Sequence, residues 1–299
     1  MREGAQAMQN KGERSFPLRL QRIVDAREKL ARHRRIATLA ALALFAAGIV
    51  WALGETQVSL AAIDWRWMLA LIPLILPALL LNAVELQVTA RMLERDMPLG
   101  SALQVTCWAM LANLLPLPGG AILRGAKLSS LGIGAARSSQ AILAGGALWA
   151  SLAVAVTLAA VLPWPLAALP LAAALGGAAF SLAWLARLGP APFALRLTMI
   201  RLALIGLTIL RIYIIFLAIG LPGNWPQAAA YSGVSVVGTL VGIVPAGLGV
   251  TEATGAVLAL LIEASPANAF LALSVNRLVG LVAASAVVAA AGMKPRETA

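Results

Sequence analysis

Cysteine and histidine are almost missing from the chain, which contains only Cys107 and His33. A single cysteine excludes an intrachain disulfide framework, and a single histidine leaves no cluster of side chains with metal-ligand spacing. The sequence also has no Ser/His/Asp set, no pair of carboxylates at close spacing, no P-loop and no Rossmann glycine pattern. We therefore expect neither an enzyme nor a metal or cofactor site.

Charged residues are also scarce. They make up 12% of the 299 residues, whereas 61% are apolar and the mean hydropathy is +0.89. Soluble domains are only about 45–50% apolar, because a soluble core cannot hide more apolar surface than that. The composition therefore predicts an all-α fold and a polytopic helical membrane protein.

The basic residues are concentrated at the N-terminus, where ten of the 23 Lys and Arg residues precede Ile36. They are Arg2, Lys11, Arg14, Arg19, Arg22, Arg27, Lys29, Arg32, Arg34 and Arg35. Anionic headgroups attract such an arm by about 1 kcal/mol per basic residue. Its basic residues are not interleaved with aromatics and it leads into an apolar run, so we expect no nucleic-acid partner. By the positive-inside rule, residues 1–35 form a cytoplasmic arm ahead of an uncleaved membrane anchor.

Apolar runs of membrane-spanning length recur through a single transmembrane domain at 36–291, which a cytoplasmic tail at 292–299 follows. A helix rises about 1.5 Å per residue and the bilayer core is about 30 Å thick, so a span needs about 20 residues. We expect spans at 36–53, 68–92, 139–162, 166–186, 201–220 and 267–291. Small residues within them predict close helix packing, above all Gly145, Gly146, Gly176 and Gly177.

Two Pro-Gly breaks interrupt apolar stretches that are too short to cross the membrane. The first break contains Pro116, Pro118, Gly119 and Gly120, and the second contains Pro245, Gly247 and Gly249. The flanking helices are expected at 101–115, 121–131, 228–244 and 251–262. In hydrocarbon, a non-helical backbone is tolerated only where protein or a water-filled cavity satisfies its polar groups. Each break is therefore predicted to be the tip of a re-entrant hairpin.

The basic loops predict the topology. Nearly all of them fall on the cytoplasmic side if the first hairpin enters from the cytoplasm and the second from outside. Both termini are then cytoplasmic, in a membrane of the bacterial inner-membrane type. The order span, hairpin, span occurs twice, at 68–162 and 201–291, in opposite orientations. Many transporters with such inverted repeats place their substrate between the repeats near the midplane.

Five charged residues fall inside the expected membrane segments: Glu85, Arg124, Arg211, Glu252 and Arg277. Charges at such depth are costly and usually functional. Three positive against two negative charges favour an anionic headgroup, because arginine binds phosphate in a bidentate manner. Together with Asn113, these side chains form the predicted substrate site, with the glutamates holding the arginines or titrating during transport.

A structural role is the alternative to substrate binding for several of these residues. Glu252 follows the second break and is placed to cap the half-helix that begins there. Arg211 or Arg277 is an alternative static partner for Glu85 or Glu252. Arg124 is close enough to a helix end to extend to the headgroups instead of the interior.

Three segments resemble one known family. They are Asn113-Leu-Leu-Pro-Leu-Pro-Gly-Gly-Ala-Ile-Leu-Arg124, Pro245-Ala-Gly-Leu-Gly-Val-Thr-Glu252 and Asn276-Arg277-Leu278. They resemble motifs of the transmembrane domain of lysylphosphatidylglycerol synthases, a flippase-like domain that also occurs as a stand-alone protein. The chain departs from that pattern at Ala121, where the family usually has Glu, and at Ala144-Gly145-Gly146, where many members have Glu-Arg.

The resemblance implies movement of lipids or lipid-linked molecules between leaflets, without synthase activity. We therefore expect a lipid flippase that moves a phospholipid, glycolipid or polyprenyl-type lipid through a polar cavity between the two hairpins. Membrane lipids are its expected partners. The alternative is a non-transporting scaffold or accessory subunit that works with lipid-biosynthesis enzymes.

Overall fold

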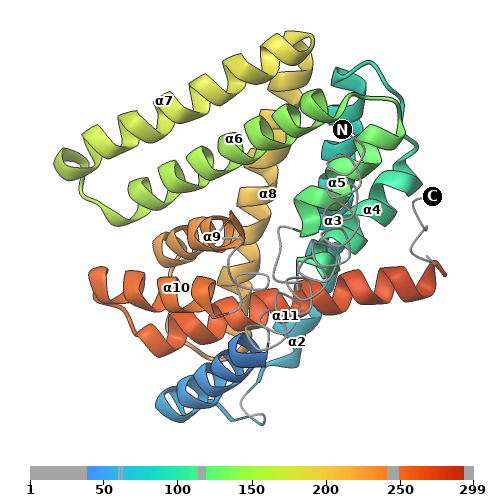
Figure 1. The fold of residues 1–299 in the computed structure, drawn as a ribbon. Helices are drawn as coiled ribbons and strands as arrows, with labels where there is room; N and C mark the ends of the chain where they lie inside the picture. Colours follow the sequence, from blue (N-terminus) through green and yellow to red (C-terminus); the bar gives the residue numbers. More distant parts are fainter. Residues whose placement is uncertain (1–38, 60, 62, 114–118, 241–248, 293–299) are drawn as a thin grey trace, which may run out of the picture.

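The computed structural model describes residues 39–59, 61, 63–113, 119–240 and 249–292, and the regular elements in these ranges are helices (Figure 1). Six apolar segments are long enough to cross a membrane: Leu39–Thr56, Trp65–Met92, Ala135–Val161, Trp164–Leu188, Ala191–Ala218 and Pro266–Ala290. The all-α class and a polytopic membrane protein are thus confirmed. Five of the six segments agree with the expected spans to within about four residues at either end.

The second span consists of two helices, α2 (Trp65–Ala70) and α3 (Ile72–Met92), because Pro73 lies in the first turn of α3. Asp64 caps α2 by accepting a hydrogen bond from the Arg66 backbone N–H at 3.0 Å. The remaining long helices are α6 (Ala135–Val161), α7 (Trp164–Leu188), α8 (Ala191–Ala218) and α11 (Pro266–Ala290). Proline within the first turn starts α7, α8 and α11, as expected where the N–H group has no helical partner.

Four shorter helices flank the two breaks: α4 (Leu99–Ala112), α5 (Gly119–Ser130), α9 (Trp225–Leu240) and α10 (Val250–Leu261). Their bounds confirm the predicted half-helices. Helix α4 packs against α5, and α9 packs against α10. The tip residues Pro116, Pro118, Pro245 and Gly247 lie outside the described residues. Entry of the two pairs from opposite membrane faces, and the inverted repeat, stay predictions.

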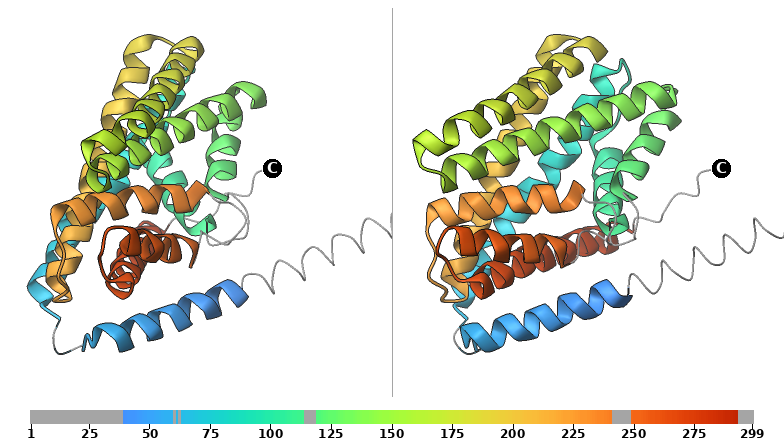
Figure 2. Two further views of the ribbon diagram at one scale, coloured as in Figure 1. Left: turned by 90° about the vertical axis from the view of Figure 1, so that its left-hand side faces the viewer. Right: turned by 60° about the vertical axis from the view of Figure 1, so that its left-hand side comes forward.

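Helix α8 is central to the arrangement, since it contacts α2, α3, α6, α7, α9 and α11. Helices α6 and α7 lie side by side and cross one end of α8, while α9 and α11 cross it nearer the other end (Figures 1 and 2). Helices α3, α4 and α5 lie on one side of this group. Two points along α8 are therefore surrounded by other helices, and both hold buried charge.

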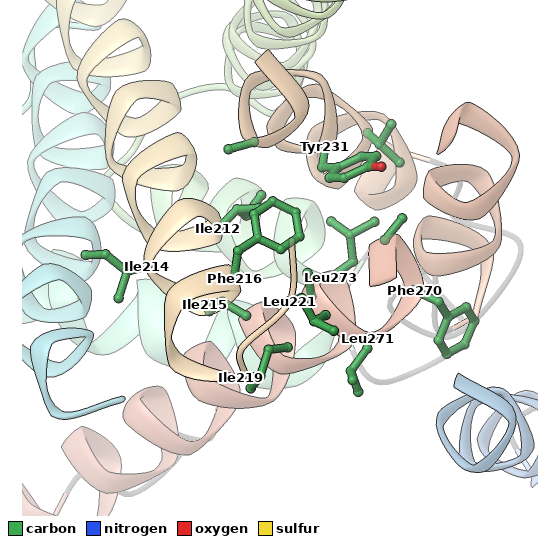
Figure 3. Packing of buried hydrophobic residues seen from close by; sticks show 14 of the residues in the cluster. Ile212, Ile214, Ile215, Phe216, Ile219, Leu221, Tyr231, Phe270, Leu271 and Leu273 are labelled. Atoms are coloured by element: carbon green, nitrogen blue, oxygen red, sulfur yellow. The ribbon is translucent and has the colours of Figure 1, made fainter. Parts of the chain in front are cut away.

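The largest core lies where α8, α9 and α11 meet (Figure 3). Phe216 of α8 faces Tyr231 of α9 with ring centroids 6.1 Å apart, and Leu273 of α11 packs into the same cluster. The first helix joins this core through Phe45, whose ring centroid lies 6.4 Å from that of Phe270. A second core surrounds the C-terminal half of α3, the first half of α6 and the start of α8.

The outer surface of the long helices is apolar. Leu169 and Phe180 on α7 are 81% and 67% exposed, and Val282 on α11 is 68% exposed. Exposing apolar side chains to water is unfavourable in free energy, whereas contact with lipid tails is not. The exposed side chains therefore mark faces that contact the bilayer.

Close helix packing is predicted at four glycines, and the structure shows it at one of them. Gly177 faces Ser151, whose Oγ would lie 2.8 Å from an added Cβ. Gly145, Gly146 and Gly176 have no atom within 4 Å of such a Cβ, so the expectation is wrong for these three. Open space beside Gly145 has a reason of its own, because this residue lines a cavity.

Candidate functional site

The charged side chains inside the helix bundle form two clusters, which are centred on two arginines of α8, Arg201 and Arg211. Ten residues separate the two arginines, which corresponds to about 15 Å along the helix axis. Glu85 and Arg124 lie in the first cluster, while Glu252 and Arg277 lie near the second. The cavity at Arg124 is not lined by Arg211, Glu252 or Arg277, so a single cavity that joins all of these residues stays a prediction.

Glu85 of α3 forms an ion pair with Arg201 of α8. Arg201 Nη2 donates to Glu85 Oε1, and both side chains are less than 10% exposed. The span expected at 201–220 has Arg201 as its first residue. Helix α8 in fact begins at Ala191, after Gly189 and Pro190, which places Arg201 three turns inside the helix.

Arg201 also lies against Trp149 of α6, with its Cζ atom 4.5 Å from the ring centroid. A guanidinium above an indole face is attracted by the ring electrons, and the attraction is stronger where water is excluded. Three helices, α3, α6 and α8, therefore fix the position of one guanidinium group.

A small cavity of about 40 Å³ adjoins this pair. Arg124 of α5 and Thr89 of α3 line it together with Glu85 and Arg201. Gly145 of α6 leaves room in the opposite wall, and the remaining lining is apolar: Leu86, Ala141, Ile142, Leu148 and Leu197. Arg124 thus faces the interior of the helix bundle, which disfavours its extension to the headgroups.

Four polar atoms of the cavity-lining residues and of Trp149, which contacts Arg201, are buried and have no hydrogen-bond partner among the described residues. They are Glu85 Oε2, Arg124 Nε, Trp149 Nε1 and Arg201 Nη1. Leaving such a group unpaired costs about 1–3 kcal/mol. Three of the four are N–H donors, so the cluster lacks acceptors rather than donors.

The second cluster is more nearly complete. Arg211 donates from Nε and Nη2 to Asn276 Oδ1 at 3.0 and 2.6 Å. Arg277 Nε donates to Glu252 Oε1 at 2.8 Å, and Glu252 is fully buried. This confirms that one of the predicted arginines has a glutamate partner, while Arg211 has an amide instead.

Glu252 also caps α10, as one of the two interpretations predicts. Its Oε2 atom accepts a hydrogen bond from the Gly249 backbone N–H at 2.9 Å. Gly249 has a φ angle of +77°, which residues with a side chain rarely adopt, so glycine suits the residue that starts this helix. Capping and pairing thus coexist in one carboxylate.

Asn113 braces the first break. Its Oδ1 atom accepts from the Gly120 backbone N–H at 2.7 Å and so joins the end of α4 to the start of α5. An added Cβ on Gly120 would lie 2.7 Å from the same Oδ1 atom, and one on Gly119 would collide with the Ala112 carbonyl oxygen. The two glycines therefore permit the close approach of α4 and α5, and binding of substrate by Asn113 stays a prediction.

A second cavity, of about 370 Å³, lies at the other end of α8. It is bounded by the α8–α9 and α10–α11 connections, with Phe216 and Tyr231 at its base. Asn224 and Gln227 accept hydrogen bonds from each other's backbone N–H groups at 2.9 and 3.2 Å. Glu263 is the charged residue of this lining, so the cavity does not favour an anion.

Comparison of the chain with protein-family models, with curated proteins and with solved structures finds no match in any of the three. Among the described residues, no group of three His, Cys, Asp or Glu side chains is placed to hold a metal ion. The described residues thus show a multi-span helical membrane protein with two clusters of arginine and glutamate between its helices.

Proposed function

We propose that the protein moves a lipid with an anionic headgroup between the two leaflets of its membrane. One observation carries the proposal. Apart from Lys127 in the last turn of α5, the described charged side chains that are not exposed are Arg124, Arg201, Arg211, Arg277, Glu85 and Glu252. Four arginines against two glutamates leave the interior with a net charge of +2.

An excess of buried positive charge is unfavourable unless a counter-ion is supplied. In a membrane protein an anionic ligand is such a counter-ion, and charges inside spans commonly mark the path of a substrate. The apolar outer faces of the helices favour a lipid over a soluble anion, because the acyl chains can remain in the bilayer while the headgroup enters the bundle.

The short helix pairs α4/α5 and α9/α10 support the same proposal. Neither α5 nor α10, with 12 residues each, reaches across a bilayer core of about 30 Å. Re-entrant hairpins that enter from opposite faces, as in inverted-repeat transporters, account for such lengths. The motif resemblance to the flippase-like family agrees, although the chain departs from that pattern at Ala121 and at Ala144-Gly145-Gly146. We propose an inner membrane of the bacterial type and cytoplasmic termini.

A non-transporting scaffold for a lipid-modifying enzyme is the second candidate. The Glu252–Arg277 pair favours it, because both carboxylate oxygens of Glu252 are used and the side chain is fully buried. A pair of this kind joins helices and leaves little for a ligand to bind. The first cluster has donors without a partner among the described residues, so a ligand can bind there. For this reason we place transport ahead of the scaffold.

The test measures movement of fluorescent lipids in vesicles that contain the purified protein. Lipids with phosphatidylglycerol and phosphatidylcholine headgroups are compared, and loss of outer-leaflet fluorescence on adding a membrane-impermeant quencher gives the rate. We expect faster exchange of the anionic lipid, and about tenfold slower exchange in Arg124→Gln/Arg201→Gln, the scale of one weakened charge contact.

Arg196→Gln is the matched control, because Arg196 is an exposed arginine on the same helix. It should exchange lipid at the wild-type rate. A second variant, Glu252→Ala/Arg277→Ala, removes the ion pair of the other cluster. Exchange in wild-type vesicles no faster than in protein-free vesicles, or no faster than in both double variants, would contradict transport and leave the scaffold.

A further inference from the structure

We propose that the cavity between α3, α5, α6 and α8 binds the phosphate group of the cargo lipid. Without bound phosphate, the Glu85 carboxylate pairs with Arg201, so it competes with the phosphate for this guanidinium group. Assigning the phosphate to a lipid rests on the proposed function. The binding chemistry rests on the cavity itself and on its polar atoms.

The described residues supply no acceptor for three donors at this cluster. Arg201 Nη1, Arg124 Nε and Trp149 Nε1 come from three different helices, and all three are buried without a partner in the described part of the chain. Arg124 and Arg201 line the cavity, and the ring centroid of Trp149 lies 4.5 Å from Arg201 Cζ. A phosphate group presents several acceptor oxygens at once, so it can accept from donors on more than one helix.

The charge of the cluster points to an anion of one negative charge. Arg124 and Arg201 contribute two positive charges, and Glu85 compensates one of them. A phosphate diester carries one negative charge and would compensate the other. The lining offers no further carboxylate that would repel it.

Glu85 holds Arg201 by one oxygen only. Its Oε1 atom accepts from Arg201 Nη2, while its Oε2 atom has no partner among the described residues. Carboxylates commonly bind arginine through both oxygens, and the single contact is the weaker arrangement. Glu252 differs, because both of its oxygens accept hydrogen bonds. The Glu85 contact is therefore the more easily exchanged of the two.

The size of the cavity requires such an exchange. About 40 Å³ is room for about three water molecules, at about 10–15 Å³ for each. A phosphate group has five non-hydrogen atoms, so it enters only if the Glu85 carboxylate moves aside. Binding thus breaks the Glu85–Arg201 contact between α3 and α8, which couples occupancy of the site to the packing of these two helices.

Binding is tested first with inorganic phosphate. The full chain is purified in a neutral detergent and titrated with sodium phosphate in a calorimeter, against sodium chloride at equal ionic strength. We expect Arg124→Gln and Arg201→Gln to weaken binding by about tenfold or more, and Arg196→Gln to leave it unchanged. Glu85→Gln should tighten binding by about tenfold, because it removes the competing negative charge and preserves the size of the side chain.

The Glu85→Gln result separates competition from a purely structural role. If Glu85 only stabilised the fold, this variant would bind phosphate no better than wild type, and that result overturns the proposal. Arg124→Gln guards against misfolding, since Arg124 contributes an unpaired Nε and its loss should not lower the melting temperature. Unchanged phosphate binding in folded Arg124→Gln would also overturn the proposal.

A second arm identifies the source of the phosphate. Nanodiscs with phosphatidylglycerol are compared with nanodiscs of a phosphate-free galactolipid, and lipid retained by the protein is identified by native mass spectrometry. Retention of phosphatidylglycerol that depends on Arg124 and Arg201 supports a lipid phosphate. Binding of inorganic phosphate with no preference between the two lipids supports the site but assigns it to a free phosphate. Phosphate binding without lipid exchange in vesicles contradicts only the transport function.

Discussion

The Nε atom of Arg277 on α11 lies 2.8 Å from Oε1 of Glu252 on α10, and the second oxygen of Glu252 accepts the Gly249 N–H at 2.9 Å. One carboxylate thus starts α10 and joins it to α11. Because Glu252 is fully buried, water cannot replace either partner. The Glu252 carboxylate therefore has a structural role. Glu85 differs, because only one of its two oxygens has a hydrogen-bond partner among the described residues.

Removing Glu252 should therefore destabilise the protein strongly. Loss of one partner from a buried ion pair leaves an uncompensated charge and costs about 3–5 kcal/mol. We expect a decrease of that size in the free energy of unfolding for Glu252→Ala. Glu252→Gln should lose less, since it retains an oxygen for one of the two hydrogen bonds. Unfolding by SDS in mixed micelles, followed by circular dichroism, measures both.

The control for this prediction is the double variant Glu252→Leu/Arg277→Met. Replacement of a buried pair by apolar residues of similar size is often neutral, so the double variant should be more stable than Glu252→Ala. If the separate effects of Glu252→Leu and Arg277→Met simply add in the double variant, the two side chains are not coupled in the way that the distance indicates.

Asn113 should be needed for the geometry of the first break. Its side chain accepts the Gly120 N–H at 2.7 Å, and Asn113→Ala leaves that donor without its partner. A loss of about 1–3 kcal/mol in unfolding free energy follows. Asn113→Asp keeps the acceptor oxygen and should retain most of the stability. Equal losses for the two variants would show that the amide acts through some other contact.

Two glycines give a matched pair for helix packing. An added Cβ on Gly233 of α9 would lie 2.6 Å from the Ala153 carbonyl oxygen and collide with Thr157 of α6, whereas Gly206 of α8 has no atom within 4 Å. We expect Gly233→Ala to cost about 1–3 kcal/mol, as overpacking does.

The same exchange at Gly206 should have the opposite sign. Alanine is favoured over glycine in a helix interior by up to about 1 kcal/mol, and no neighbour opposes the added methyl group. Thermal unfolding of the two variants in one detergent compares them directly. A lower melting temperature for Gly206→Ala would contradict the open space beside this residue and mean that another group packs against this face of α8.

The sequence predicts those features that depend on local runs of residues. Apolar length locates the six spans, and the proline and glycine positions locate the ends of α4, α5, α9 and α10. The capping role of Glu252 is also local, because Gly249 lies three residues before it. In each case the partners are neighbours in the chain, so spacing alone carries the information.

The first cluster escapes prediction because its partners are distant. Glu85 and Arg201 are 116 positions apart, and their contact depends on how α3 crosses α8. Arg201 is hidden further by the rule that a charge ends a span, which α8 violates by continuing ten residues toward the N-terminus. Asn276 likewise shows no sign in the sequence of binding Arg211, since the pair joins two separate helices.

Asn276 offers the last test, because its amide oxygen accepts two hydrogen bonds from Arg211 at 3.0 and 2.6 Å. Asn276→Ala removes that acceptor from a half-buried guanidinium and should lower the unfolding free energy by about 1–3 kcal/mol. Asn276→Asp supplies a negatively charged acceptor, which attracts the positively charged guanidinium more strongly than a neutral amide does. The two changes should therefore move stability in opposite directions, as measured by SDS unfolding. Asn268→Ala, in the first turn of α11, controls for loss of an amide on the same helix and should have little effect. Equal destabilisation by the Ala and Asp variants would contradict this prediction. It would show that a negatively charged partner for Arg211 does not stabilise the fold, and so that the excess positive charge does not lower stability at this end of α8.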